Sequence, residues 1–162
     1  CTILDTRKTL PGFRSLDKYA VRAGGGGNHR SALDSGVLLK ENHVTAAGGV
    51  SAAVRAAKAS AAHLLKVEVE IERLDQLESA IAAGADLVML DNMDLAQMRS
   101  AVGLASGRVQ LEASGNMTLE RLAAVAETGV DFISIGGLTH SVRAADLSLR
   151  VVNADSTATG AA

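Results

Sequence analysis

The amino-acid sequence predicts an α/β fold, in which parallel strands alternate with helices. Along the 162 residues, short apolar runs rich in branched side chains alternate with longer stretches of helical periodicity. The joint between helix and strand also repeats. "AGADLVML" (83–90) and "TGVDFISI" (128–135) each place a helix end before Gly, an apolar residue, Asp and four mostly apolar strand residues. Repeated joints of this kind favour a barrel or a doubly wound sheet.

The elements follow in order along the chain. Strands are expected at residues 2–6, 37–40, 66–71, 86–90, 108–112 and 131–136, and helices at 16–23, 51–62, 74–83, 95–105 and 119–128. Asp94 with Gln97 predicts an N-cap, and Gly84 and Gly129 stand where a left-handed C-cap is wanted. "DLSLRVV" (146–152) alternates like a strand. It is expected to pair outside this chain, because a barrel strand is buried on both faces.

The composition limits the number of domains and the kinds of partner that the chain can have. The 48% of hydrophobic residues suffice for one core, so residues 1–152 are expected to form one barrel domain and the small, polar residues 153–162 a flexible tail. A net charge of −2 and 2% aromatic residues exclude a nucleic-acid partner. The only cysteine, Cys1, excludes a disulfide framework and a cysteine-rich metal site.

The location expected from the sequence is the cytoplasm. No apolar run approaches the roughly 20 residues that span a bilayer, so no membrane partner is expected. The chain begins with Cys1, inside an apparent strand, and we therefore expect upstream sequence to be missing.

Each expected strand is followed, or ended, by residues suited to chemistry. In chain order these are Arg7 and Lys8, Lys40, Glu70, Asp91, Ser114 and Gly115, and Gly136 and Gly137. In α/β barrels the loops at the carboxyl ends of the strands converge on one mouth, where the active site forms. The sequence therefore predicts an active site at this mouth.

The mouth is expected to have a cationic, an anionic and a glycine-rich sector. The cations are Arg7, Lys8, His29, Arg30 and Lys40, and the anions are Glu70 and Asp91. The turns "ASGN" and "IGGLTH" have unhindered backbone N–H groups that can hold a phosphate. An anionic substrate, a phosphate and a divalent metal would satisfy this set, and carboxylates without thiolates suit Mg²⁺ or Mn²⁺ rather than zinc.

Simpler interpretations stay open for several of these residues. Arg7 and Lys8 could be surface charges, and the run of four glycines at 24–27 has no nucleotide-binding fingerprint around it. Glu68, Glu70 and Glu72 share one face of a strand, and alternation does not say which of them is functional. His43 and His63 are expected to be structural.

The ordered motifs resemble the quinolinate phosphoribosyltransferase family. They are "DTRKTLPGFRSLDKYAVRAGGGGNHR", "LLKENH", "VEVE", "MLDN", "EASGN" and "SIGGLTHS", and they reach to about Arg150. The resemblance implies the α/β barrel of the type II phosphoribosyltransferases, with the family's N-terminal sandwich domain missing from this chain. It also implies a homodimer or higher homo-oligomer, in which one subunit lends an arginine to its neighbour's site.

The resemblance further implies a reaction and a set of site residues. Quinolinate and phosphoribosyl pyrophosphate would give nicotinate mononucleotide, pyrophosphate and CO₂, with Mg²⁺ as the cofactor. Lys8, Lys40, Glu70 and Asp91 would be catalytic, and Glu70 and Asp91 would also face the metal. Substrate would be bound by Thr6, Arg7, Lys8, His29, Arg30 and Lys40. Phosphate would be bound by Ser114, Gly115, Asn116, Gly136, Gly137, Leu138 and His140. Many relatives have glycine at the position of Asn116.

Two other functions remain possible from the sequence. A sister transferase could act on another aromatic acid, although a monocarboxylate would need fewer cations than the five assembled here. A barrel that binds a phosphorylated metabolite without chemistry would bind ligand and form no product. Turnover that depends on Mg²⁺ would eliminate this second alternative.

Overall fold

The computed structural model describes residues 1–151, and the tail expected at 153–162 lies outside that range. All strands pair in parallel in one six-stranded sheet with the order β1-β6-β5-β4-β3-β2. The strands are β1 (Thr2–Leu4), β2 (Val37–Leu39), β3 (Val67–Ile71), β4 (Leu87–Asp91), β5 (Gln110–Ser114) and β6 (Phe132–Ser134). The parallel order follows from the helices between successive strands, which return the chain to the same end of the sheet.

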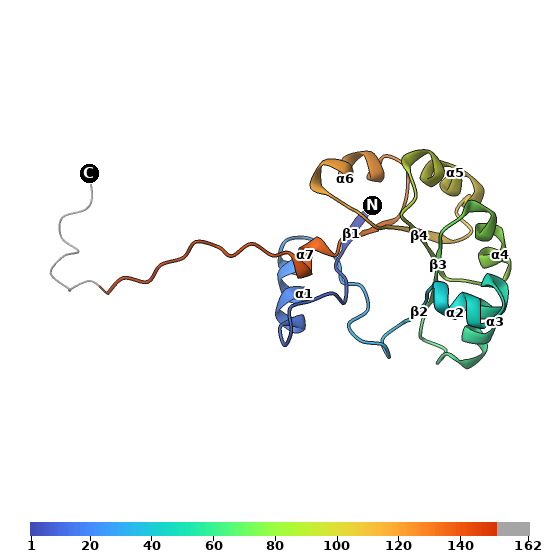
Figure 1. Ribbon diagram of the computed structural model, residues 1–162, viewed down its shortest axis with the longest axis horizontal. Helices are drawn as coiled ribbons and strands as arrows, with labels where there is room; N and C mark the ends of the chain where they lie inside the picture. The colour runs from blue at the N-terminus through green and yellow to red at the C-terminus, as the bar shows by residue number, and fades with distance from the viewer. Residues whose placement is uncertain (152–162) are drawn as a thin grey trace.

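Helices cover the outside of the curved sheet (Figure 1). They are α1 (Arg14–Ala23), α2 (Glu41–Ala46), α3 (Val50–Ser60), a 3₁₀ turn η1 (Leu74–Gln76), α4 (Leu77–Ala82), α5 (Leu95–Ala105), α6 (Leu119–Ala126) and α7 (Gly137–His140). The expected bounds of α5 are confirmed. Asp94 Oδ1 accepts the backbone N–H of Gln97 at 2.8 Å, and Gln97 Oε1 accepts that of Asp94 at 2.9 Å.

The sheet forms an open, partial barrel, as expected. β1 and β2 are its two edges, and the chain from α1 to β2 crosses the opening between them (Figure 1). In this crossing segment Gly27 forms a parallel bridge with Leu4 of β1. A Cβ on Gly27 would lie 2.9 Å from the Leu4 side chain, so the close approach requires glycine.

The two faces of the sheet differ in polarity. Apolar side chains such as Val69 and Leu90 face the helices and belong to the buried core. Glutamates at alternate positions point to the inner side, and Glu68, Glu70 and Glu112 are all buried there. The barrel therefore has an apolar outer layer and a polar interior.

The repeated joint that the sequence displays has a structural basis. Gly84 and Gly129 have φ values of +87° and +96°, the left-handed region that favours glycine. Asp86 Oδ2 accepts the backbone N–H of Val67 at 2.7 Å, and Asp131 Oδ2 accepts that of Leu111 at 2.8 Å. Each aspartate thus ties the start of its own strand to the start of the preceding one.

Several expectations require correction. β5 begins and ends two residues later than expected, at Gln110–Ser114, because a left-handed C-cap at Ser106 and a turn separate it from the end of α5 at Ala105. The helix expected at 74–83 starts as the 3₁₀ turn, and the short helices α2 and α7 were not expected.

The strand expected from "DLSLRVV" does not form within the described part of the chain. Residues 142–151 run as extended chain away from the barrel (Figure 1), with Leu149 97% exposed. Alternation alone supplies no partner strand. Among residues 1–151, no helix combines the length and apolar character needed to cross a membrane.

Candidate active site

The carboxyl ends of the strands gather the predicted residues at one rim of the barrel. Lys40 directly follows β2, and its Nζ donates to Glu70 Oε2 on β3 at 2.8 Å. On the neighbouring pair of strands, Asp91 lies in register with Ser114. The register of four parallel strands therefore places a cation, two carboxylates and a hydroxyl on one edge.

Glu70 is the best-enclosed member of this rim. Its side chain is only 7% exposed, whereas that of Lys40 is 49% exposed. Burial raises the pKa of Glu70, the Lys40 ammonium opposes the rise, and the nearby Asp91 carboxylate adds to it. The charge of the Asp91 carboxylate thus acts on Glu70, as expected for two carboxylates that face one ligand.

A cationic pocket lies beside the carboxylates. Arg7, Arg30 and Lys40 line a cavity of about 610 Å³, together with apolar residues of β2 and alanines of α3. Burial, and next the charge of Arg7, lower the pKa of Arg30. Arg7 Nε is buried and has no hydrogen-bond partner among the described residues. Two adjacent guanidinium groups with an unused donor suit a planar anion such as a carboxylate.

The turn after β5 is held by an asparagine that the sequence analysis did not single out. Asn92 accepts a hydrogen bond from Asn116 Nδ2 at 3.0 Å through Oδ1, and its own Nδ2 donates to Asp91 Oδ2 at 2.7 Å. Gly115 has a φ of +91°, and a Cβ there would lie 2.2 Å from Asn92 Oδ1. The predicted residues Ser114, Gly115 and Asn116 are thus packed against the end of β4.

The turn after β6 meets the segment after β1. A Cβ on Gly136 would lie 2.8 Å from His140 Nε2 and 3.8 Å from Lys8 Cδ, so these three predicted residues lie close together. Gly137, Leu138 and His140 belong to the short helix α7. The fully buried Thr139, which sequence analysis missed, donates its hydroxyl to Lys8 O at 2.6 Å. Its Oγ1 also lies 3.4 Å from Thr6 Oγ1.

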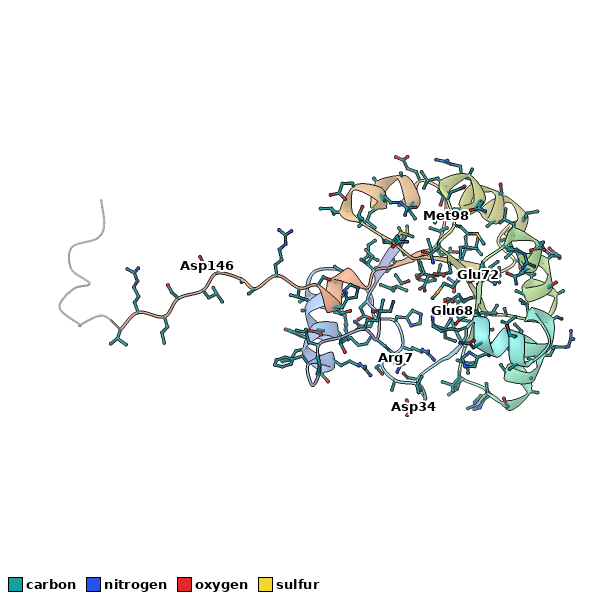
Figure 2. The ribbon with its side chains drawn as sticks, viewed as in Figure 1. Arg7, Asp34, Glu68, Glu72, Met98 and Asp146 are labelled. Atoms are coloured by element: carbon teal, nitrogen blue, oxygen red, sulfur yellow. The ribbon has the colours of Figure 1, made fainter. Side chains whose placement is uncertain are left out.

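His29 lies apart from the cationic cavity. Its Nε2 is 3.0 Å from Glu68 Oε2 and 3.7 Å from Glu112 Oε2, inside the ring of strands. Figure 2 shows Glu68 and Arg7 on the inner side of that ring. From the sequence, the role of Glu68 stayed open, and Glu112 was not among the predicted site residues. The signal was present, because "VEVE" and "QLEAS" put each glutamate on the inner face of its strand.

Comparison with known proteins gives consistent matches. The profile of the family described as "Quinolinate phosphoribosyl transferase, C-terminal domain" matches residues 1–150. A Bacillus subtilis protein named "Probable nicotinate-nucleotide pyrophosphorylase [carboxylating]" is 50% identical over 149 residues, which are 92% of this chain and 52% of the relative. A Mycobacterium leprae protein named "Nicotinate-nucleotide pyrophosphorylase [carboxylating]" is 49% identical over 150 residues, covering 91% of this chain and 52% of its own length.

A solved structure agrees with these sequence matches. That of the nicotinate-nucleotide pyrophosphorylase from Francisella tularensis superposes with a TM-score of 0.85 at 52% identity, over 91% of this chain and 52% of that one. The chain spans about half the length of the curated relatives it matches. The open barrel, the rim and the family match therefore lead to one conclusion, that this chain belongs to the quinolinate phosphoribosyltransferase family and corresponds to its C-terminal domain.

Proposed function

We propose that the protein containing this chain transfers phosphoribosyl from phosphoribosyl pyrophosphate to quinolinate, giving nicotinate mononucleotide, pyrophosphate and CO₂. The observation that carries the proposal is the cationic cavity of Arg7, Arg30 and Lys40 beside the carboxylate of Glu70. This reaction requires cations that bind a dicarboxylate and carboxylates that stabilise a cationic sugar. The family match supports the same reaction.

The cavity is suited to the acceptor substrate. Quinolinate is a planar dianion, and two guanidinium groups and an ammonium can neutralise it while the alanine-lined wall contacts its ring. Lys40 would exchange its bond to Glu70 for one to a substrate carboxylate, which its half-exposed side chain allows. Lys8 would contribute from the neighbouring turn after β1.

Glu70 and Asp91 would face the donor substrate. Asp91 is half-buried at the rim, and its charge is felt by Glu70, so two oxygen ligands and no thiolate are available. This donor set fits Mg²⁺, which proteins bind through one or two carboxylates together with substrate phosphates. Mg²⁺ held there would screen the negative charge of the departing pyrophosphate.

The chain's own residues act by position and charge. As the bond from C1 of the ribose to pyrophosphate breaks, the sugar becomes cationic, and the carboxylates of Glu70 and Asp91 would stabilise it. The ring nitrogen of quinolinate, held in the cavity, then bonds to C1 and becomes a pyridinium. The electron pair of the adjacent C–CO₂⁻ bond flows into that ring as CO₂ leaves, and a proton takes its place on carbon. Alignment of the two substrates would supply much of the rate.

The glycine turns would hold the phosphates. Ser114, Gly115 and Asn116 follow β5, and Gly136, Gly137, Leu138 and His140 follow β6. Gly115, Gly136 and Gly137 have no side chain of their own to cover their backbone N–H groups, which suits close approach of a phosphate.

We also propose a homodimer that works in the cytoplasm. The family resemblance supports the dimer, with an arginine from the partner completing the dicarboxylate site. The lone, exposed Cys1 is compatible with a reducing compartment. Sedimentation of the natural protein would test the dimer, and a monomer with full activity would contradict it.

The test of the reaction is Mg²⁺-dependent release of labelled CO₂ from carboxyl-labelled quinolinate in the presence of phosphoribosyl pyrophosphate. It uses the natural protein that contains this chain, with the chain alone in parallel. Release that requires both substrates and Mg²⁺ is expected. Turnover of nicotinate but not quinolinate would mean that the acceptor substrate is a different aromatic acid. Binding of ligand without formation of product would contradict catalysis.

A further inference from the structure

A pair of buried glutamates, Glu68 and Glu112, lies in the barrel interior and takes no part in the reaction proposed above. Glu112 is 1% exposed and Glu68 5% exposed. Both oxygens of Glu112, and Oε1 of Glu68, find no hydrogen-bond partner in the described part of the chain. A buried carboxylate without partners is costly, so two of them on adjoining positions of the barrel interior require a reason.

His29 connects this pair to the pocket. The backbone N–H of Arg30 donates to His29 Nδ1 at 2.8 Å, so Nδ1 carries the lone pair. The hydrogen of the neutral ring is then on Nε2, which lies 3.0 Å from Glu68 Oε2 and donates to it. Both ring nitrogens are thus engaged, one with the barrel interior and one with the backbone of a pocket residue.

The same short segment is also held through its backbone. The N–H of His29 donates to Asp5 Oδ1 at 2.9 Å, and its carbonyl accepts from Lys18 Nζ at 2.9 Å. The segment crosses the opening between β1 and β2, where Gly27 bridges to Leu4 of β1 but no such pairing with β2 or β3 is found among the described residues. The hydrogen bond from the His29 side chain to Glu68 therefore connects this crossing segment to β3.

We propose that Glu68 and Glu112 are positioning residues, which fix His29 as an Nε2–H donor and thereby hold Arg30 in the anion pocket. Glu112 acts in its acid form and donates its hydroxyl to the free oxygen of Glu68, which completes a chain from Glu112 through Glu68 and His29 to the Arg30 backbone. Arg30 in turn donates through Nη1 to Gly36 O at 3.0 Å, which sets the direction of its guanidinium.

The charge balance supports this arrangement. Burial, and next the charge of Glu68, raise the pKa of Glu112 to about 7 against the opposing effects of His29 and Ser134, so Glu112 keeps a proton at pH values where an ordinary glutamate has lost it. One oxygen of each glutamate and one ring nitrogen of His29 lie within 4.8 Å of one another. A proton shared among these groups gives a hydrogen-bond partner to carboxylate oxygens that otherwise have none.

A metal ion is the competing occupant of this cluster, since one imidazole and two carboxylates could ligate one. A metal on Nε2 would require the hydrogen on Nδ1, where it would face the N–H of Arg30. Metal-bound histidines normally donate their other N–H to an acceptor. Because the Arg30 N–H already donates to Nδ1, a proton on Nε2 is favoured there over a metal ion.

The first measurement is the tautomer of His29 in the natural protein labelled with ¹⁵N-histidine. Only four histidines are present, and His29→Asn assigns the signal. The expected signal is a neutral ring protonated at Nε2. A ring protonated at Nδ1 would overturn the inference without any further variant.

The second measurement joins the tautomer to substrate binding and rests on the proposed function. Glu68→Leu removes the acceptor, so the single tautomer should be lost and KM for quinolinate should rise about tenfold or more, with a smaller change in kcat. Glu68→Gln keeps an acceptor and Glu112→Gln keeps a donor, so both should retain the tautomer and most of the affinity. Glu72→Leu, an exposed neighbour on the same segment, is the matched control.

The outcomes separate the two proposals. An unchanged His29 signal in Glu68→Leu refutes the positioning role whether or not the enzyme turns over quinolinate. Should that variant fail to fold, Glu68→Ala, which removes the same acceptor of the His29 Nε2–H, takes its place with the same expectation. Absence of turnover in the natural protein would refute the reaction, while the tautomer measurement would still decide the role of Glu68.

Discussion

Lys40 and Glu70 form an ion pair of 2.8 Å across the rim of the barrel, joining the end of β2 to β3. The pair is asymmetric, because the carboxylate is nearly enclosed and the ammonium is half exposed. The exposed ammonium of Lys40 is free to turn towards solvent or a ligand, whereas the enclosed Glu70 stays where it is. The geometry therefore gives a cation that can turn to an incoming anion beside a carboxylate that is fixed.

Lys40→Met should reduce kcat/KM for quinolinate by about a hundredfold, because a buried carboxylate loses its partner and the substrate loses a cation. Steady-state kinetics with quinolinate varied would measure the change. Lys58→Met is the control, since Lys58 forms a similar pair at 2.9 Å with Asp86, which lies before β4 at the amino ends of the strands. Equal losses in both variants would mean that the rim pair is merely structural.

Gly115→Ala should raise KM for phosphoribosyl pyrophosphate by at least about tenfold, because the new Cβ must displace Asn92 and distort the turn after β5. Gly84→Ala shares the positive φ but meets no atom within 4 Å, so it should cost only stability. Titration of the donor substrate at fixed quinolinate compares the two. Similar kinetics for both variants would remove Gly115 from the phosphate site.

Asp131→Ala should lower the free energy of unfolding by about 1–3 kcal/mol, because the buried N–H of Leu111 loses its acceptor. Denaturant unfolding would measure this loss, with Asp34→Ala at an exposed position as the reference. Asp131→Asn keeps an acceptor oxygen and should recover part of it. A loss no larger than that of the reference would show that the repeated joint is not held by its aspartate.

Glu112→Gln should become more stable relative to the unchanged protein as pH rises. Burial raises the pKa of Glu112 from 4.5 to about 7, so the folded state resists ionisation that the unfolded chain accepts. The penalty is absent below about pH 4.5, grows towards pH 7 and is constant above it, reaching about 3 kcal/mol at most. Unfolding at a series of pH values would test the sign, and a constant difference between the two proteins would contradict it.

Much of the fold was predictable from the sequence, because helical periodicity and branched apolar runs report local structure directly. The N-cap at Asp94 and the glycines of the repeated joints were predicted and are present. The short helix α2 was not, because its six residues carry too little periodicity to be recognised. The pairing expected for the segment after α7 stays a prediction, because its partner was expected outside this chain and residues 146–151 form no strand within it.

The candidate site was predictable to the extent that it follows strand ends. Lys40, Glu70 and Asp91 could be placed at the rim from their positions in the chain, and their contacts agree with that placement. The inward direction of Glu112 could be read from "QLEAS", but its contact with His29 could not, because His29 approaches from a segment far away in sequence. Such long-range contacts have no signature in local pattern.

The parallel register has a consequence for how the active state arises. Side chains alternate between the two faces of a strand, so a slip of one residue in β3 or β4 would turn Glu70 or Asp91 from the interior to the helix layer. Under the proposed function, molecules with such a shifted pairing would be inactive rather than weakly active. The specific activity of a refolded sample would then measure the fraction of molecules whose strands are correctly paired.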